Sequence, residues 1–232
     1  MSELKGKIDF VALISATEAN PNGDPLNGNR PRENFDGFGE ISDVCIKRKI
    51  RNRWQDMGQK IFVQSDDRSD DTYSSLKERA DGYTPLQEEI KKGKKADRDK
   101  CAQLACQEWL DVRSFGQVFA FKGVEVSLGV RGPVSIHQAV SVSPVDIVSM
   151  QITKSVNSEA GKEGKASDTM GTKHRIEFGL YVLKGSVNVQ LAEKTGIPAD
   201  LHSLARIRDT IPQKELNHQE RRKNLNNAFK MD

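Results

Sequence analysis

The segment that most constrains the fold is a β-like apolar run over residues 7 to 18. Its apolar positions are Ile8, Phe10, Val11, Leu13 and Ile14. Its apolar centre, Phe10 to Ala16, is too short to span a bilayer, and acidic residues flank that centre, with Glu3 and Asp9 before it and Glu18 after it. It therefore predicts a buried strand rather than a signal sequence, and we expect no transmembrane segment.

A long loop follows this strand and runs to about Ile41. It contains Asn20-Pro-Asn-Gly-Asp-Pro25 and then Asn27-Gly-Asn29, which are residue types that favour turns and positive φ. Long loops inside compact domains are usually functional or disordered. Two interpretations stay open, a structural turn and a cradle of backbone N–H groups and side chains for a phosphate or a base edge. The side chains of this candidate cradle are Asn20, Asn22, Arg30 and Arg32.

A helix is predicted over residues 43 to 57, with Ser42 as its N-cap. Its apolar stripe consists of Ile46, Ile50, Trp54 and Met57. Lys47 and Arg51 lie one turn apart on the flank of that stripe, and Arg48 lies on the remainder. The basic flank either grips consecutive phosphates or is an ordinary solvated face.

The rest of the chain alternates between polar and β-rich regions. Residues 64 to 100 are strongly polar and predict an insertion of short helices, followed by a helix over 97 to 110. The predicted strands beyond it cover residues 118–121, 124–130, 134–142, 147–156 and 175–189, the last broken at Lys184-Gly-Ser186.

The length, net charge and cysteine content of the chain limit which folds and functions are plausible. The chain has 232 residues, which suits one large domain with insertions, and 36 basic against 33 acidic residues leave a net charge of only +3. Only a local cluster of basic residues therefore supports binding of nucleic acid. The three cysteines, Cys45, Cys101 and Cys106, form no disulfide framework and no zinc pattern, which favours a reducing cytoplasm.

Two further segments carry candidate binding residues. The first combines Asp111-Val-Arg-Ser-Phe-Gly116 with Val130-Arg-Gly-Pro133. In a nucleic-acid interface, Arg113 and Arg131 would contact the phosphate backbone and Phe115 would stack on a base. The alternative is that Phe115 belongs to the core and Asp111 pairs with Arg113.

The second is a polar excursion over residues 157 to 171. Its basic roots are Lys154, Lys173, His174 and Arg175, and Met170 stands near its tip. Such an arm folds over a nucleic acid and wedges the methionine between bases, or it is a disordered hairpin loop.

The sequence offers no catalytic set. His137 and His174 are isolated, and neither a Walker loop nor a dinucleotide-binding fingerprint is present. Asp24, Asp36 and Asp43 could collect a divalent metal, but scattered loop aspartates more often serve turns and caps. We expect no cofactor, no bound metal and no catalytic residue.

The ordered motifs resemble a known family. They are NPNGDP, GEISDVCIKRKIRN, DVRSFGQVF, VRGPVSI and MGTKHRIEFGLYVLKGSVN followed by LAEKTG. In this order they are similar to the repeated backbone subunit of type I-C CRISPR Cascade complexes, part of the repeat-associated RNA-binding superfamily. The resemblance covers nearly everything from Lys7 to Gly196.

The resemblance implies an α+β fold. Residues 1 to 232 would form a single modified ferredoxin-like palm, of the RNA-recognition type, with insertions. These are helical fingers over 59–110 and a protruding β-hairpin thumb over 150–176. Residues 42 to 58 match the palm helix, whereas the tail over 197–232 does not match the family and reflects divergence, truncation or a frameshift.

The resemblance also implies a non-catalytic function in antiviral defence. Copies of the subunit coat the spacer of a CRISPR RNA as a helical filament, and the guide then pairs with target DNA. The implied partners are CRISPR RNA, target DNA, further copies of the chain, and the large, small and RNA-processing end-capping subunits, in the cytoplasm without a membrane. The implied RNA-binding residues are Asn20, Asn22, Arg30, Arg32, Lys47, Arg48, Arg51, Arg113, Phe115, Arg131, Lys154, Met170, Lys173, His174 and Arg175.

Two alternatives stay open. One is a metal-dependent ribonuclease of the same superfamily that uses a loop aspartate such as Asp36, and the other is a general RNA-binding protein. In the tail, Leu201, Leu204 and Ile207 predict a short helix that ends before Pro212 and covers the palm only partly.

Overall fold

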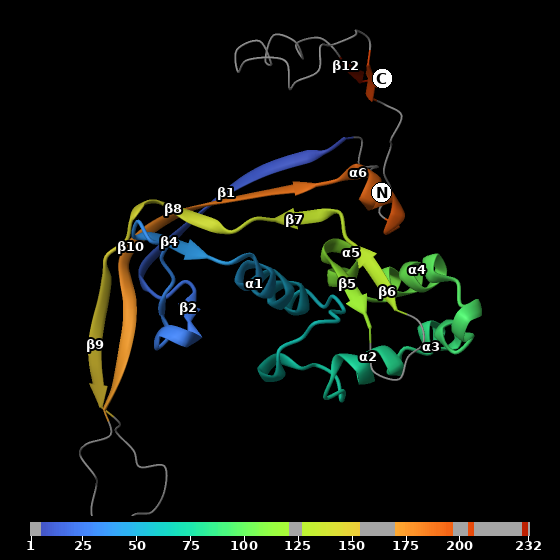
Figure 1. Cartoon of the computed structure of the whole chain (residues 1–232), viewed down its shortest axis with the longest axis horizontal. Coiled ribbons are helices and arrows are strands. Elements are labelled where there is room, and N and C mark those ends of the chain that lie inside the picture. Colours follow the sequence, from blue (N-terminus) through green and yellow to red (C-terminus); the bar gives the residue numbers. More distant parts are fainter. Residues whose placement is uncertain (1–5, 121–126, 154–169, 197–203, 207–228, 232) are drawn as a thin grey trace, which may run out of the picture. The chain divides into compact units, whose positions relative to one another are not determined.

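The structure, a computed structural model, describes residues 6–120, 127–153, 170–196, 204–206 and 229–231 (Figure 1). The chain divides into two compact units. We call residues 10–49 with 136–185 the sheet unit, and residues 1–9, 50–135 and 186–232 the helical unit. Within the described residues, no helix has the length and apolar character needed to cross a membrane.

A six-stranded sheet dominates the sheet unit. Its strands are β1 (Ile8–Ala19), β4 (Phe38–Ile41), β7 (Val134–Ile136), β8 (Ala139–Pro144), β9 (Ile147–Thr153) and β10 (Met170–Val187). The order is β1-β10-β8-β4, and both β7 and β9 also pair with β10. From the Ile176–Ile147 pair to the Met170–Thr153 pair, β9 and β10 form a long antiparallel ribbon (Figure 1).

Alternating side chains give this sheet one buried and one open face. On the buried face, Tyr181 is fully buried and reaches Gly39, where a Cβ would lie 2.6 Å from the tyrosine hydroxyl. The ring of Phe10 likewise fills the space above Gly185. The opposite face leaves large apolar side chains exposed, namely Val11, Leu13, Val142 and Phe178.

The loop after β1 contains short elements of regular secondary structure. It contains β2 (Gly23–Asp24), the 3-10 turn η1 (Pro25–Asn27) and β3 (Arg30–Pro31), and it continues into β4. Helix α1 (Asp43–Asp56) follows, and the amide of Cys45 donates to Oγ of Ser42 at 3.3 Å. The predicted N-cap and helix are therefore confirmed, whereas the prediction missed β4.

The helical unit contains short helices around an aromatic core. Its elements are η2 (Asp66–Arg68), α2 (Leu76–Gly82), α3 (Thr84–Ile90), η3 (Gly93–Lys95), α4 (Arg98–Glu108), α5 (Leu110–Phe115), β5 (Gly116–Phe119), β6 (Leu128–Arg131) and α6 (Val189–Lys194). Phe62 lies 4.7 Å from Trp109 and 5.0 Å from Phe119 between ring centroids. The buried thiols of Cys101 and Cys106 lie in the same core, and burial raises the pKa of Cys106 to about 11.

Two glycines explain the motifs around residues 111 to 116 and 130 to 133. Gly116 has a φ of 81°, and a Cβ there would overlap the carbonyl oxygen of Val130. A Cβ at Gly132 would overlap the carbonyl oxygen of Ser114. Because both positions leave no room for a side chain, these glycines allow β5 and β6 to pair closely.

Three expectations differ from the structure. β10 is one continuous strand, so the predicted break at residues 184–186 is wrong; the carbonyl oxygen of Lys184 accepts a hydrogen bond from the amide of His137 at 3.0 Å. β1 is mostly exposed rather than buried, because Ala16 is its one buried residue. Leu204–Arg206 is a strand, β11, paired with β12 (Phe229–Met231), and not part of the predicted short helix. The rest of the tail, residues 121–126 and the thumb segment 154–169 lie outside the described residues.

Candidate nucleic-acid interface

The Asn/Gly/Pro loop is fixed to the start of helix α1. Asn22 Oδ1 accepts hydrogen bonds from both the amide (2.9 Å) and the hydroxyl (2.8 Å) of Ser42. Nδ2 of Asn20 donates to the carbonyl oxygen of Asn29 at 2.7 Å. The Oδ1 atom of Asn20 is buried and has no hydrogen-bond partner in the described part of the chain. Asn22 therefore holds the loop in place, and Asn20 retains an acceptor that no described donor satisfies.

The turn at the tip of the loop is equally well defined. Asp24 caps η1 by accepting from the amide of Leu26 at 3.1 Å, and its carboxylate lies 3.5 Å from Arg32. The amide of Arg32 donates to the carbonyl of Asn22 at 2.9 Å. The backbone of Arg32 is thus part of the loop scaffold, while its partly exposed side chain is positioned by Asp24.

The loop reaches the β9–β10 ribbon through a short polar chain. Nη1 of Arg30 donates to Oγ of Ser149 at 3.2 Å, and the same Oγ lies 2.9 Å from Nδ1 of His174. Ser149 and His174 face each other in the ribbon register. This brings two residues predicted from separate motifs, Arg30 and His174, to one exposed place within the sheet unit. Ser149 joins them, and the sequence analysis did not identify it.

The ribbon carries the remaining predicted basic residues of the thumb root. Arg175 makes an ion pair of 3.1 Å with Glu18 at the end of β1. Lys173 is exposed and makes no ion pair with any described residue. Met170 is 60% exposed, and its sulfur accepts from the Gln151 amide at 2.6 Å. Lys154 lies outside the described residues.

Helix α1 presents Lys47 and Arg48 within the sheet unit. Nζ of Lys47 lies 2.9 Å from a carboxylate oxygen of Asp43, one turn earlier. The hydrogen bond from Lys47 holds the pKa of Asp43 below its ordinary value, with burial opposing the effect. Lys47 and Arg48 are both half-buried, so only part of each side chain is accessible from solvent.

Arg51 and Phe115 have structural partners inside the helical unit. Arg51 Nε lies 3.0 Å from a carboxylate oxygen of Asp111, whose side chain is 1% exposed. The guanidinium lies over the Phe115 ring at 5.2 Å, and that ring stacks on Trp54 at 5.2 Å. Asp111 also accepts hydrogen bonds from the amides of Phe62 (2.7 Å) and Val63 (3.0 Å). The carboxylate of Asp111 thus pairs with Arg51, not with Arg113 as the alternative interpretation had it.

The other two predicted arginines of the helical unit differ in exposure. Arg131 is exposed on β6. Arg113 is half-buried, and its Nε has no hydrogen-bond partner among the described residues. Both residues stay predicted contacts.

The candidate metal ligands are dispersed over the loop. Asp24 caps a turn, Asp43 pairs with Lys47, and Asp36 stands exposed at a turn where its amide donates to Asn34. Within the described residues, no group of three His, Cys, Asp or Glu side chains lies close enough to hold a metal ion.

The chain is similar in sequence to a curated CRISPR-associated protein. The chain is 25% identical over 229 residues to a CRISPR-associated protein Cas7 of Haloferax volcanii. That match covers 91% of this chain and 64% of the relative, so the chain spans about two thirds of the relative's length.

A solved structure described as a CRISPR RNA-guided surveillance complex, pre-nicking, contains a chain of 17% identity with a TM-score of 0.44. The match covers 82% of this chain and 67% of that chain. The family model for CRISPR-associated protein Cas7 matches residues 6–213, so the prediction that the match ends at Gly196 is wrong. Since that match spans most of the sequence, the chain belongs to the Cas7 family of CRISPR-associated proteins.

Proposed function

We propose that this protein is a non-catalytic CRISPR-RNA-binding backbone subunit of a Cascade complex, of type I-C. The observation that carries the proposal is the Arg30–Ser149–His174 array, which joins the loop after β1 to the root of the β9–β10 ribbon. Lys173 follows on the same ribbon without a described ion-pair partner. Because the chain belongs to the Cas7 family, we infer that the bound nucleic acid is CRISPR RNA.

The chemistry of this surface suits an RNA backbone. Guanidinium and ammonium groups contact phosphates irrespective of base, and such contacts position a nucleic acid without reading its sequence. Arg30 donates only one hydrogen bond to a described partner, so other donors of its guanidinium remain available. A subunit that coats a guide of any sequence needs contacts of this kind, because base pairing supplies the specificity.

The sheet order supports a ferredoxin-like palm. Such a palm places its first strand between the third and the last, and its second strand beyond the third. The order β1-β10-β8 reproduces the first, third and second strands, and β4 is added beyond them. Among the described strands none pairs with the outer edge of β1, where the last strand of the palm would lie.

The remaining parts of the proposal follow from the resemblance to the type I-C subunit. The β9–β10 ribbon is the lower part of a thumb, and the short helices between residues 59 and 110 are fingers. Copies of the chain assemble along the guide with the large, small and end-capping subunits, and the guide pairs with target DNA. Met170, exposed at the far end of the described ribbon, is the proposed wedge residue.

Co-expression with a CRISPR array tests this function. The wild-type chain should copurify with array-derived RNA of defined length, whereas Arg30→Ala combined with Lys173→Ala should retain much less of it. Lys91→Ala combined with Arg98→Ala is the matched control, because both residues are exposed in the helical unit. Copurification of mixed cellular RNA would instead favour a general RNA-binding protein. Equal retention by both double variants would refute the proposed surface.

A further inference from the structure

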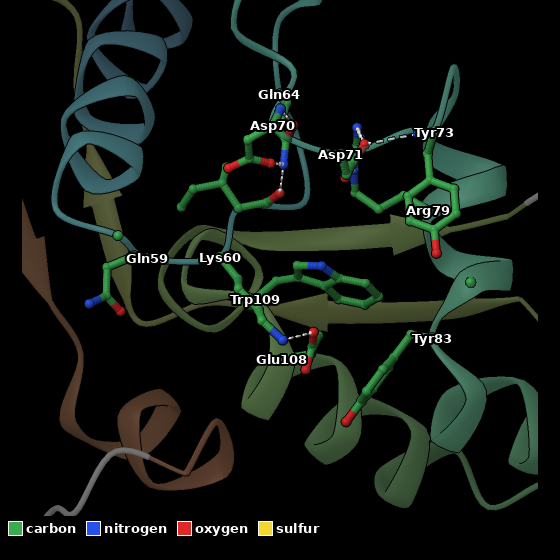
Figure 2. A pocket seen from close by; sticks show the side chains of 13 residues that line it. Gln59, Lys60, Gln64, Asp70, Asp71, Tyr73, Arg79, Tyr83, Glu108 and Trp109 are labelled. Atoms are coloured by element: carbon green, nitrogen blue, oxygen red, sulfur yellow. Dashed lines mark hydrogen bonds and ion pairs between the residues drawn. The ribbon is translucent and has the colours of Figure 1, made fainter.

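The helical unit contains a pocket that shares no residue with the predicted RNA contacts (Figure 2). Its volume is about 380 Å³, which lies within the range of small-ligand sites. It is lined by Gly58, Gln59, Lys60, Ile61, Gln64, Asp70, Asp71, Tyr73, Arg79, Gly82, Tyr83, Glu108 and Trp109. The pocket lies entirely within the helical unit.

Three aromatic side chains form the apolar part of the wall. Tyr83 meets Trp109 edge-on, with 5.4 Å between ring centroids, and Trp109 itself is only 4% exposed. Tyr73 lies against the bare backbone of Gly82, where a Cβ would overlap its hydroxyl. No hydrogen bond from either tyrosine hydroxyl to another described residue is present in the structure. The pocket therefore offers aromatic surface together with two uncommitted hydroxyl groups.

Most of the charge in the wall is already paired. Arg79, 6% exposed, donates to Asp71 at 2.6 and 2.9 Å and to the carbonyl oxygen of Phe62 at 2.9 Å. Hydrogen bonding from Arg79 lowers the pKa of Asp71. Lys60 and Glu108 form a second pair at 2.6 Å, and that contact raises the pKa of Lys60. Each of these two ion pairs is neutral overall.

Asp70 is the lining residue whose negative charge is not balanced by one of these ion pairs. Its Oδ1 accepts from the Gln64 amide at 2.6 Å, and its own backbone amide donates to Oε1 of Gln64 at 3.1 Å. Its carboxylate is exposed and has no ion-pair partner among the described residues. The pair of hydrogen bonds with Gln64 fixes this carboxylate at the pocket rim, as Figure 2 shows. The pocket thus carries net negative charge beside aromatic rings.

We propose that this pocket receives a basic side chain, in particular an arginine, from the surface of a partner protein. A planar guanidinium binds aromatic rings and carboxylates at once, and its several N–H groups match the carboxylate and the two tyrosine hydroxyls. A phosphate backbone, by contrast, would meet the uncompensated charge of Asp70. The inference goes beyond RNA binding and does not depend on it.

Fluorine NMR of the full chain labelled with 5-fluorotryptophan tests the proposal. The chain has two tryptophans, so Trp54→Phe assigns the signal of Trp109. The probes are N-acetyl-arginine amide, its neutral citrulline analogue and uridine monophosphate. The arginine probe should shift the Trp109 signal saturably, and the other two should not.

Asp70→Asn provides the decisive variant, because it keeps the acceptor for Gln64 and removes the charge. It should weaken binding of the arginine probe about fivefold, while Asp67→Asn, an exposed neighbour outside the pocket, should leave binding unchanged. A Trp109 shift with uridine monophosphate but not with arginine would make the pocket a nucleic-acid site and overturn the proposal. Absence of any shift up to tens of millimolar, or equal binding of arginine and citrulline, would overturn it too.

Discussion

Two arginines of the helical unit and two of the sheet unit have opposite kinds of partner. In the helical unit the side chains of Arg51 and Arg79 are 13% and 7% exposed, and each is bound to one carboxylate. In the sheet unit Arg30 donates to a serine hydroxyl, and Arg175 pairs with Glu18, a residue whose side chain is 63% exposed. The same residue type therefore stabilises a core in one region and belongs to the proposed RNA-binding surface in the other.

Substitutions at these two kinds of arginine should therefore affect different properties, stability in one case and binding in the other. Removing a partner from a buried ion pair leaves an uncompensated charge, which destabilises the folded state strongly. Removing a solvated cation costs little stability but takes a phosphate contact away. Variants at the buried ion pairs of the helical unit should consequently lose stability, whereas variants at the solvated cations of the sheet unit should lose RNA binding.

The largest effect is expected for Asp111→Ala in the helical unit. The change removes the partner of Arg51 and the acceptor for the amides of Phe62 and Val63. The free energy of unfolding should fall by about 3–5 kcal/mol, measured by urea denaturation followed by circular dichroism. Asp67→Ala, an exposed acidic residue of the same unit, is the control and should change it by less than about 0.5 kcal/mol. Equal stability of the two variants would contradict the assigned role of Asp111.

The next effect concerns RNA binding by the sheet unit. Arg30→Ala with Lys173→Ala should weaken binding of single-stranded RNA about tenfold at physiological salt, for every sequence alike. The slope of log affinity against log salt should flatten by about 1.4 units, because two phosphate contacts are lost. Fluorescence anisotropy across a salt series measures both quantities. A change in sequence preference with an unchanged slope would show that these residues read bases.

Local signals in the sequence were sufficient to predict helix α1 and the first strand as elements. Helix α1 followed from its apolar spacing and from Ser42, whose hydroxyl does cap it. The apolar run that predicted the first strand matches the position of β1, but the prediction that this strand is buried is wrong, since Val11 and Leu13 are exposed. In both cases the information lies within a few neighbouring residues, which is why periodicity and capping rules could use it.

The site depended on contacts that no local rule contains. Arg30 and Ser149 are 119 residues apart, and Arg51 and Asp111 are 60 residues apart. A basic flank on α1 gave no sign that Lys47 stays near solvent while Arg51 is buried against a carboxylate from another helix. The aromatic pocket was missed for the same reason, since its lining comes from residues 58 to 109 without a motif.

A smaller effect is expected at Glu89, which tests whether buried pairing in the helical unit also governs its response to pH. The Glu89 carboxylate, 4% exposed, accepts from Lys92 (2.7 Å), Lys100 (3.0 Å) and the amide of Asp97 (3.2 Å). These hydrogen bonds, that of Lys92 first, lower its pKa from 4.5 to about 2. Because the folded-state pKa is depressed, the stabilisation is complete above pH 4.5 and is lost as the pH falls toward 2.

Glu89→Gln should therefore lower the melting temperature at neutral pH. The difference from the wild type should shrink as the pH falls through the window between the two pKa values. Glu88→Gln, an exposed neighbour in α3, is the matched control and should melt like the wild type at each pH. A difference that stays constant with pH would mean that shape rather than charge of Glu89 matters. Differential scanning calorimetry gives the melting temperatures.

The smallest expected effect lies at Ser149, which tests whether the polar chain of the sheet unit serves binding rather than folding. Its hydroxyl accepts from Arg30 and contacts His174, yet it is exposed, so its hydrogen bonds add little to stability. Ser149→Ala should leave the free energy of unfolding within about 0.5 kcal/mol of the wild type and weaken RNA binding about twofold, because Arg30 loses its orientation. Ser149→Thr keeps a hydroxyl and should bind more tightly than the alanine variant, and Ser143→Ala, an exposed serine on β8, should bind as the wild type does. If Ser149→Ala instead destabilised the fold while RNA affinity stayed the same, the array would belong with the structural ion pairs of the helical unit, and the contrast between the two units would fail at this point.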